Sequence, residues 1–153
     1  MEVDSEQLPI PHSVIDHFRN LRHIVKLKAG PPVRVFAKSF EDRGAYMSGL
    51  LGWLRRRRNR RRVVFLDPDT GLEPTRNPDH AHVLESEVRK IWEIMAPGEI
   101  LALYQHQTNR RGEPWIEPKR VQFERALGLP KGAAKLARAP SIARDVVLFF
   151  AMK

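Results

Sequence analysis

The chain contains no cysteine, which excludes disulfide bonds and thiolate metal sites. It also lacks any apolar run near the ~20 residues that a membrane-spanning helix needs, so we expect no membrane insertion. Its first residues, 1–7, are polar and acidic and do not resemble a secretory signal. These absences predict a protein of the cytoplasm that does not bind membranes.

Several common catalytic and cofactor motifs are missing as well. The sequence has no GxGxxG, no GxxxxGK[ST] and no serine-centred nucleophile elbow, so neither a dinucleotide loop nor a P-loop is indicated. Acidic residues are also outnumbered, because 18 Asp and Glu stand against 27 Lys and Arg, for a formal net charge of +9. A charge of this sign favours polyanionic partners, with nucleic acid first among them.

What remains is the composition of an ordinary globular domain. The chain has 153 residues, 42% of them hydrophobic and 29% charged, and a chain of this size can bury roughly 70% of its unfolded surface in one core. We expect a flexible arm over residues 1–11, which ends in Pro9-Ile10-Pro11, and a single α/β domain over residues 12–153.

Hydrophobic periodicity predicts alternating helices and strands in this domain. We expect helices from Ser13, over 45–57, over 79–95 and from Pro118 to Gly128, and strands over 33–37, 63–67, 100–104 and 146–152; residues 130–144 are ambiguous. Apolar strands separated by helices are typical of a parallel sheet. The predicted fold is three-layered, with a mostly parallel four-stranded sheet, helices on both faces and a half-Rossmann-like layout.

Polar side chains follow three of the predicted strands. In parallel sheets, ligands bind beyond the carboxyl ends of the strands, so we expect one crevice to receive Asp67, Asp69, Gln105, His106, Gln107, Lys38 and Ser39. Two carboxylates and an imidazole there can hold Mg²⁺ or Mn²⁺, or transfer protons. The competing interpretation is a plain turn at Asp67-Pro68-Asp69-Thr70-Gly71, because these are usual turn residues, with His106 a structural group.

A run of seven arginines in eight positions, Arg55 to Arg62, directly precedes the second strand. Such a run is either a solvated helix end or a phosphate-binding surface, and its mutual repulsion favours the second interpretation. The predicted nucleic-acid contacts are Arg55, Arg56, Arg57, Arg58, Arg60, Arg61, Arg62, Arg110 and Arg111. The sequence thus predicts an arginine-rich patch beside the acidic and histidine-containing crevice.

Residues 60–110 resemble a group of uncharacterised bacterial proteins. In these, one strand ends in Asp-Pro-Asp-x-Gly-Leu-Glu, as at residues 67–73, and a later strand ends in Tyr-Gln-His, as at residues 104–106. The group is similar in layout to Rossmann-like S-adenosylmethionine-dependent methyltransferases. Asp69 and Thr70 stand where amino-methyltransferases have a proline and an aromatic residue, and the glycine-rich cofactor loop has no counterpart, which weighs against S-adenosylmethionine. The resemblance implies half of such a fold, completed by homodimerisation.

Three functions follow as hypotheses. The first is a nucleic-acid-binding protein whose arginines supply affinity. The second is a divalent-metal-dependent nuclease or phosphodiesterase, in which Asp67 and Asp69 hold Mg²⁺ or Mn²⁺ and His106 is a ligand or base. The third is a non-catalytic, dimeric accessory protein of a mobile element, in which the acidic residues only form a turn.

Overall fold

The computed structural model describes residues 2–3, 6–7, 32–56, 61–109 and 114–153. Its main feature is a six-stranded mixed sheet with the strand order β2-β1-β7-β8-β6-β3. The strands are β1 (Glu2–Val3), β2 (Glu6–Gln7), β3 (Val63–Leu66), β6 (Ile100–His106), β7 (Lys135–Ala139) and β8 (Ala143–Met152). A small second sheet pairs β4 (Gly71–Leu72) with β5 (His82–Val83).

The predicted mostly parallel four-stranded sheet is wrong. Only β3 and β6 run parallel in the main sheet, whereas β8 lies antiparallel to both β6 and β7. The ambiguous segment 130–144 contains β7 and a short reversal into β8, and such a hairpin connects antiparallel neighbours only. Residues 33–37, predicted as the first strand, have no regular structure. The half-Rossmann layout is therefore not the fold of this chain.

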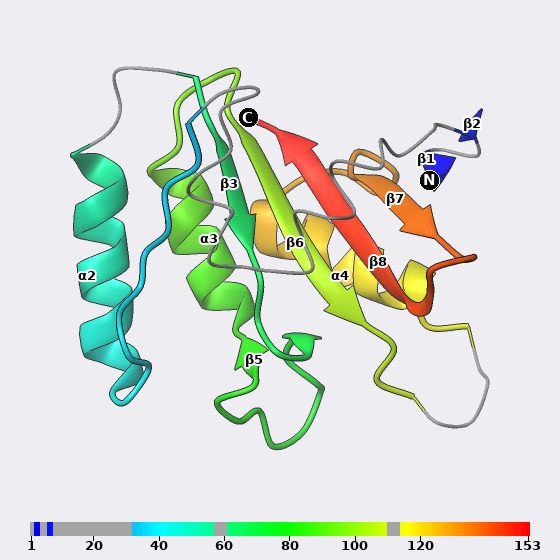
Figure 1. Cartoon of the computed structure of the whole chain (residues 1–153), viewed down its shortest axis with the longest axis horizontal. Coiled ribbons are helices and arrows are strands. Elements are labelled where there is room, and N and C mark those ends of the chain that lie inside the picture. Colours follow the sequence, from blue (N-terminus) through cyan, green and yellow to red (C-terminus); the bar gives the residue numbers. More distant parts are fainter. Residues whose placement is uncertain (1, 4–5, 8–31, 57–60, 110–113) are drawn as a thin grey trace.

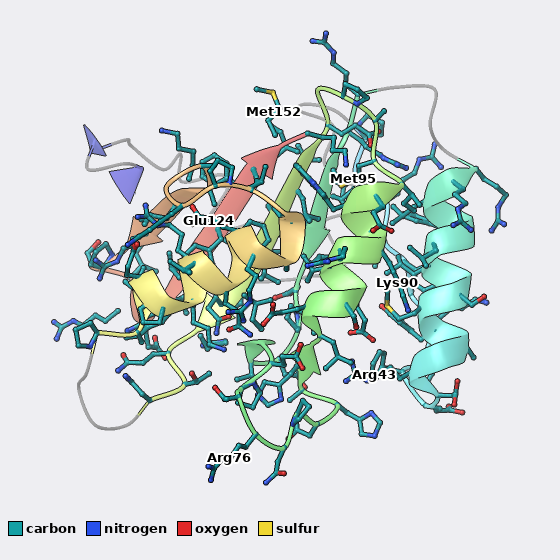
Figure 2. All side chains as sticks on the ribbon, turned by 180° about the vertical axis from the view of Figure 1, so that it is seen from behind. Arg43, Arg76, Lys90, Met95, Glu124 and Met152 are labelled. Atoms are coloured by element: carbon teal, nitrogen blue, oxygen red, sulfur yellow. The ribbon has the colours of Figure 1, made fainter. Side chains whose placement is uncertain are left out.

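In the described part of the chain, three helices accompany the sheet: α2 (Arg43–Arg55), α3 (Glu85–Glu93) and α4 (Ile116–Leu127). Helices α3 and α4 lie behind the sheet in Figure 1 and in front of it in Figure 2, so they cover one face, and α2 lies beside α3. None of the described helices covers the other face of the sheet. The helix predicted from Ser13 lies outside the described residues, and only residues 2–3 and 6–7 of the arm predicted over residues 1–11 lie within them.

The helix predicted over residues 79–95 is shortened to α3 because its first part is used elsewhere. The Asp79 carboxylate accepts a hydrogen bond from the Ala81 N–H and forms a turn, and the Thr70 N–H donates to the Ala81 carbonyl. These contacts extend the chain into β5 beside β4. The helices predicted over residues 45–57 and from Pro118 to Gly128 are observed as α2 and α4, with ends that differ by a few residues. Asp42 caps the start of α2, and Gly128, with a φ of 69°, ends α4.

The core lies between the sheet and the helices. It contains Leu101, Leu103, Val147 and Phe149 from the sheet and Phe123 from α4, all fully buried. Because strand side chains alternate between faces, the residues between them point the other way. We call that side of the sheet the second face; Val63 and Phe65 of β3, Tyr104 and His106 of β6, and Met152 of β8 belong to it.

Candidate functional site

The acidic segment after β3 is a turn, and the Gln105 side chain binds its backbone from the core face of the sheet. The Gln105 side chain is fully buried on the core face; its Oε1 accepts from the Leu72 N–H, and its Nε2 donates to the carbonyls of Thr70 and His106. Gly71 has φ of 120°, and a Cβ added there would lie 2.4 Å from Gln105. The turn therefore requires glycine at position 71, and it leaves Asp67 and Asp69 exposed.

Four titratable side chains converge where this turn meets the second face. Asp67 follows β3, Tyr104 and His106 lie at the end of β6, and Asp145 lies near the start of β8. The rings of Tyr104 and His106 meet edge to face with centroids 4.9 Å apart, and His106 Nδ1 lies 3.9 Å from Asp145 Oδ2. The predicted meeting of Asp67 and His106 rests on the parallel pairing of β3 with β6, which is observed. We call these four residues the carboxyl-end cluster.

Mutual electrostatics tie the cluster together. Partial burial raises the pKa of Asp67, the nearby Asp69 charge raises it further, and His106 lowers it. Burial also raises the pKa of Tyr104, with smaller contributions from the charges of Asp67 and Asp145. Proton-transfer groups with perturbed pKa values are typical of functional sites. The cluster can therefore exchange protons or bind a cationic group.

The geometry of the carboxyl-end cluster supports a metal site less well than it supports proton transfer. Within residues 32–56, 61–109 and 114–153, no group of three or more His, Asp or Glu side chains is placed to hold a metal ion. Asp67, Asp69 and His106 thus do not form the ligand set that the sequence predicts for Mg²⁺ or Mn²⁺.

Exposed cations gather at the opposite end of the same strands. Arg55 and Arg56 end α2, Arg61 precedes β3, and all three are exposed. A Cβ at Gly98 would lie 3.5 Å from Arg61 Nε, and the Gly98 N–H donates to the Lys153 carbonyl, so Arg61 and Lys153 share this edge. We call Arg55, Arg56, Arg61 and Lys153 the basic edge.

Arg62 has a structural place instead. Its Nη1 donates to the Leu54 carbonyl over 2.7 Å. Its Nε lies 2.8 Å from Glu99 Oε1, close enough for an ion pair although the atoms are not aligned for a hydrogen bond. Glu99 is only 1% exposed. Arg62 therefore neutralises a buried carboxylate, and its guanidinium points into the protein rather than toward a partner.

The basic edge does not adjoin the carboxyl-end cluster, contrary to the arrangement expected from the sequence. Arg61 and Asp67 flank β3 at its two ends, about 20 Å apart for extended chain. In Figure 1 the chain enters β3 at the top and leaves it at the bottom. A short segment of sequence had suggested one site, but an extended strand separates its two ends.

The remaining predicted residues are placed as follows. Arg57, Arg58, Arg60, Arg110 and Arg111 lie outside the described residues. Lys38 lies against α2, because a Cβ at Gly49 would be 3.7 Å from its Nζ, and Ser39 donates to Glu41; neither follows a strand. Beyond the predicted residues, Lys119 of α4 donates to the Leu72 and Glu73 carbonyls and anchors β4.

Asp145 is the functional candidate that sequence reasoning missed. It reaches the cluster because β8 runs antiparallel to β6, so that the start of one strand adjoins the end of the other, and the Gln107 N–H donates to its carbonyl. The signal in the sequence was the polar stretch before the apolar run at 146–152, but a parallel sheet would place it at the opposite edge.

No protein-family model, no curated protein and no solved structure matches this chain. The resemblance of residues 60–110 to a group of uncharacterised bacterial proteins therefore stays a prediction, whereas the half-Rossmann layout that it implied is not the fold of this chain. In the described part of the chain, no helix combines the length and the apolar character that crossing a bilayer requires.

Proposed function

We propose that this chain is a small basic α/β protein that binds nucleic acid through its basic edge. The observation that carries the proposal is the exposure of Arg55, Arg56 and Arg61 at one edge, in a chain of net charge +9. Other arginines are held by carboxylates, as Arg43 is by Glu87 and Arg125 by Glu85. The proposal assumes a protein of the cytoplasm.

Phosphate contacts supply the affinity in this proposal. Each arginine that neutralises a phosphate releases counterions, so binding weakens as salt rises, with a logarithmic slope near −0.9 per contact on duplex DNA. Arg57, Arg58 and Arg60 lie between Arg56 and Arg61 in sequence and, like Arg110 and Arg111, lie outside the described residues; the proposal assigns phosphate contacts to all five. Contacts of this kind do not select a base sequence.

Fluorescence anisotropy with random-sequence duplex and single-stranded oligonucleotides across a salt series tests the proposal. The double variant Arg55→Ala/Arg56→Ala should lower the affinity roughly tenfold or more at low salt and reduce the salt slope by about 2. Arg76→Ala/Arg144→Ala is the matched control, since both side chains are exposed, and Figure 2 shows Arg76 at the end opposite Met152. Equal losses in the two double variants would mean that only net charge matters.

The carboxyl-end cluster favours a second candidate, a nuclease or phosphodiesterase. Asp67 with its raised pKa and His106 near Asp145 are suitable acid and base groups. Labelled oligonucleotides should then be cleaved, and Asp67→Asn and His106→Ala should each abolish cleavage while folding and binding persist. Assays with and without Mg²⁺ or Mn²⁺ separate a metal-assisted reaction from a metal-free one. Binding without cleavage under every condition would leave only the first candidate.

A further inference from the structure

Strand β3 forms one border of the main sheet. Among the described residues it pairs with β6 alone, and it appears in Figure 1 as the strand nearest α2. Val63 is 64% exposed and Phe65 49% exposed, among the few large hydrophobic side chains that reach solvent. The strand contains neither proline nor lysine, the residues that commonly protect a sheet edge. An apolar, unprotected edge of this kind is a template for strand pairing.

The hydrogen-bonding groups along this edge are set by the β3–β6 ladder. The Ile100 N–H donates to the Arg62 carbonyl, and in a parallel ladder the groups of successive residues point to alternate sides. The groups of the even-numbered β3 residues therefore face β6, and those of Val63 and Phe65 face outward. Within the described chain, no hydrogen bond from outside the ladder reaches Val63 or Phe65.

We propose that β3 pairs antiparallel with β3 of a second copy about a twofold axis at Val64. Outward-facing residues must oppose one another in such a pair, so Val63 of each copy lies opposite Phe65 of the other. The two sheets then join into one continuous sheet across the dimer. A twofold interface of this type is self-complementary, because the same strand supplies both sides.

The register accounts for both exposed apolar side chains. Val63 and Phe65 lie on the second face of each copy, and directly opposed residues of an antiparallel pair share a face. The pairing therefore gathers two valines and two phenylalanines on one surface. A β-branched residue opposite an aromatic one is a favourable cross-strand combination.

Charge complementarity points to a second copy rather than an unrelated strand. The chain carries arginine before β3 and aspartate after it, and antiparallel pairing about Val64 sets Arg61 of each copy opposite Asp67 of the other. A shift of the axis to Phe65 sets Arg61 opposite Asp69 instead. Both registers bring opposite charges together at both ends of the interface, whereas parallel pairing would stack arginines on arginines.

Sedimentation equilibrium on nuclease-treated protein measures the association. Arg61→Glu and Asp67→Arg should each raise the dimer dissociation constant at least tenfold, because each places like charges across the interface. Mixing these two variants should restore dimers. The introduced glutamate of one variant then faces the introduced arginine of the other, and the unchanged Arg61 faces the unchanged Asp67. Far-ultraviolet circular dichroism and thermal melts establish that both variants fold.

A third variant tests the edge itself. Phe65→Lys should also raise the dissociation constant at least tenfold, whereas Met152→Lys, an exposed apolar residue of the interior strand β8, should not. A monomeric wild-type protein at every concentration overturns the proposal. A dimer that tolerates these changes, or one that mixing does not restore, also overturns it, because association then uses another surface. The outcome does not depend on bound nucleic acid, because the protein is nuclease-treated, and Phe65→Lys and Asp67→Arg leave Arg55, Arg56 and Arg61 of the basic edge unchanged.

Discussion

The two ends of the β3–β6 pair are built in opposite ways. At the amino end, Arg62 is directed inward to the buried Glu99, while its neighbour Arg61 is exposed. At the carboxyl end, a neutral glutamine points into the core while the next residue, His106, points to the second face. In both places one residue stabilises the fold and its neighbour is available at the surface, because successive residues of an extended chain point to opposite sides.

The ends also differ in what holds them. The amino end relies on a single ion pair between Arg62 and Glu99, with the Leu54 carbonyl as a further acceptor. The carboxyl end relies on several hydrogen bonds: Gln105 accepts from the Leu72 N–H and donates to the Thr70 carbonyl, and Lys119 donates to the Leu72 carbonyl. The exposed charges at each end are therefore supported by separate structures, and each can be disrupted alone.

The largest effect is expected at the carboxyl end from Gly71→Ala. The new Cβ would lie 2.4 Å from the buried Gln105 side chain, at a φ of 120° that alanine rarely adopts. Strain and overpacking together predict a loss of about 4 kcal/mol in the free energy of unfolding. Urea denaturation measures it, with Gly132→Ala as control: its φ is 84°, but its Cβ would meet nothing within 4 Å, so a loss of about 1 kcal/mol is expected. Similar losses at both positions would show that Gln105 gives way.

At the amino end, Arg62→Ala should cost about 3 kcal/mol, because it leaves the Glu99 carboxylate buried without its cation. Arg61→Ala should change stability by less than about 0.5 kcal/mol, since the side chain is exposed. The two variants have equal net charge and are compared by chemical denaturation. Equal stability of the pair would contradict the division of roles between these neighbours.

An intermediate effect is expected from Lys119→Met. The Leu72 and Glu73 carbonyls and the Gln122 side chain would lose their shared donor, and we expect a loss of about 2 kcal/mol. Lys131→Met, at an exposed position, is the control and should be nearly neutral. If both methionine variants are equally stable by thermal and urea unfolding, Lys119 does not anchor β4.

The smallest effect concerns pH. Because the native pKa of Asp67 is raised by partial burial and by Asp69, ionisation favours the unfolded chain, and stability falls as pH rises from the unfolded value near 3.9 through the native pKa. Asp67→Asn should therefore be slightly more stable than wild type at neutral pH and equal to it below about pH 4.

Asp79→Asn provides a control of opposite sign. The hydrogen bond from the Ala81 N–H, and then that from His82, lower the pKa of Asp79, so its contribution is present above the unfolded pKa and lost as pH falls through the native one. Asp79→Asn should be less stable than wild type at neutral pH, and this deficit should shrink as the medium is acidified. Denaturation midpoints from pH 3 to 8 measure both variants; shifts of the same sign would contradict the assignment.

Much of the local structure followed from pattern alone. The apolar run before Asp67 and the one before His106 predicted β3 and β6, and the helix between them made parallel pairing the natural arrangement. The errors arose where long-range contacts decide. Residues 79–83 have a helix-compatible pattern, but pairing with β4 draws His82 and Val83 into a strand. Asp145 was missed because the direction of β8 depends on the short reversal after β7.

The amino-acid sequence by itself determined the charge polarity around β3, with arginines before it and aspartates after it, and the alternation that sends each neighbour to a different side. These are local properties of an extended chain with known composition. Only the tertiary structure decided that Arg62 would meet Glu99, that Asp145 would join Asp67 and His106, and that β3 would border the sheet. Those outcomes depend on which distant segments pack together, and packing is settled by the whole core at once.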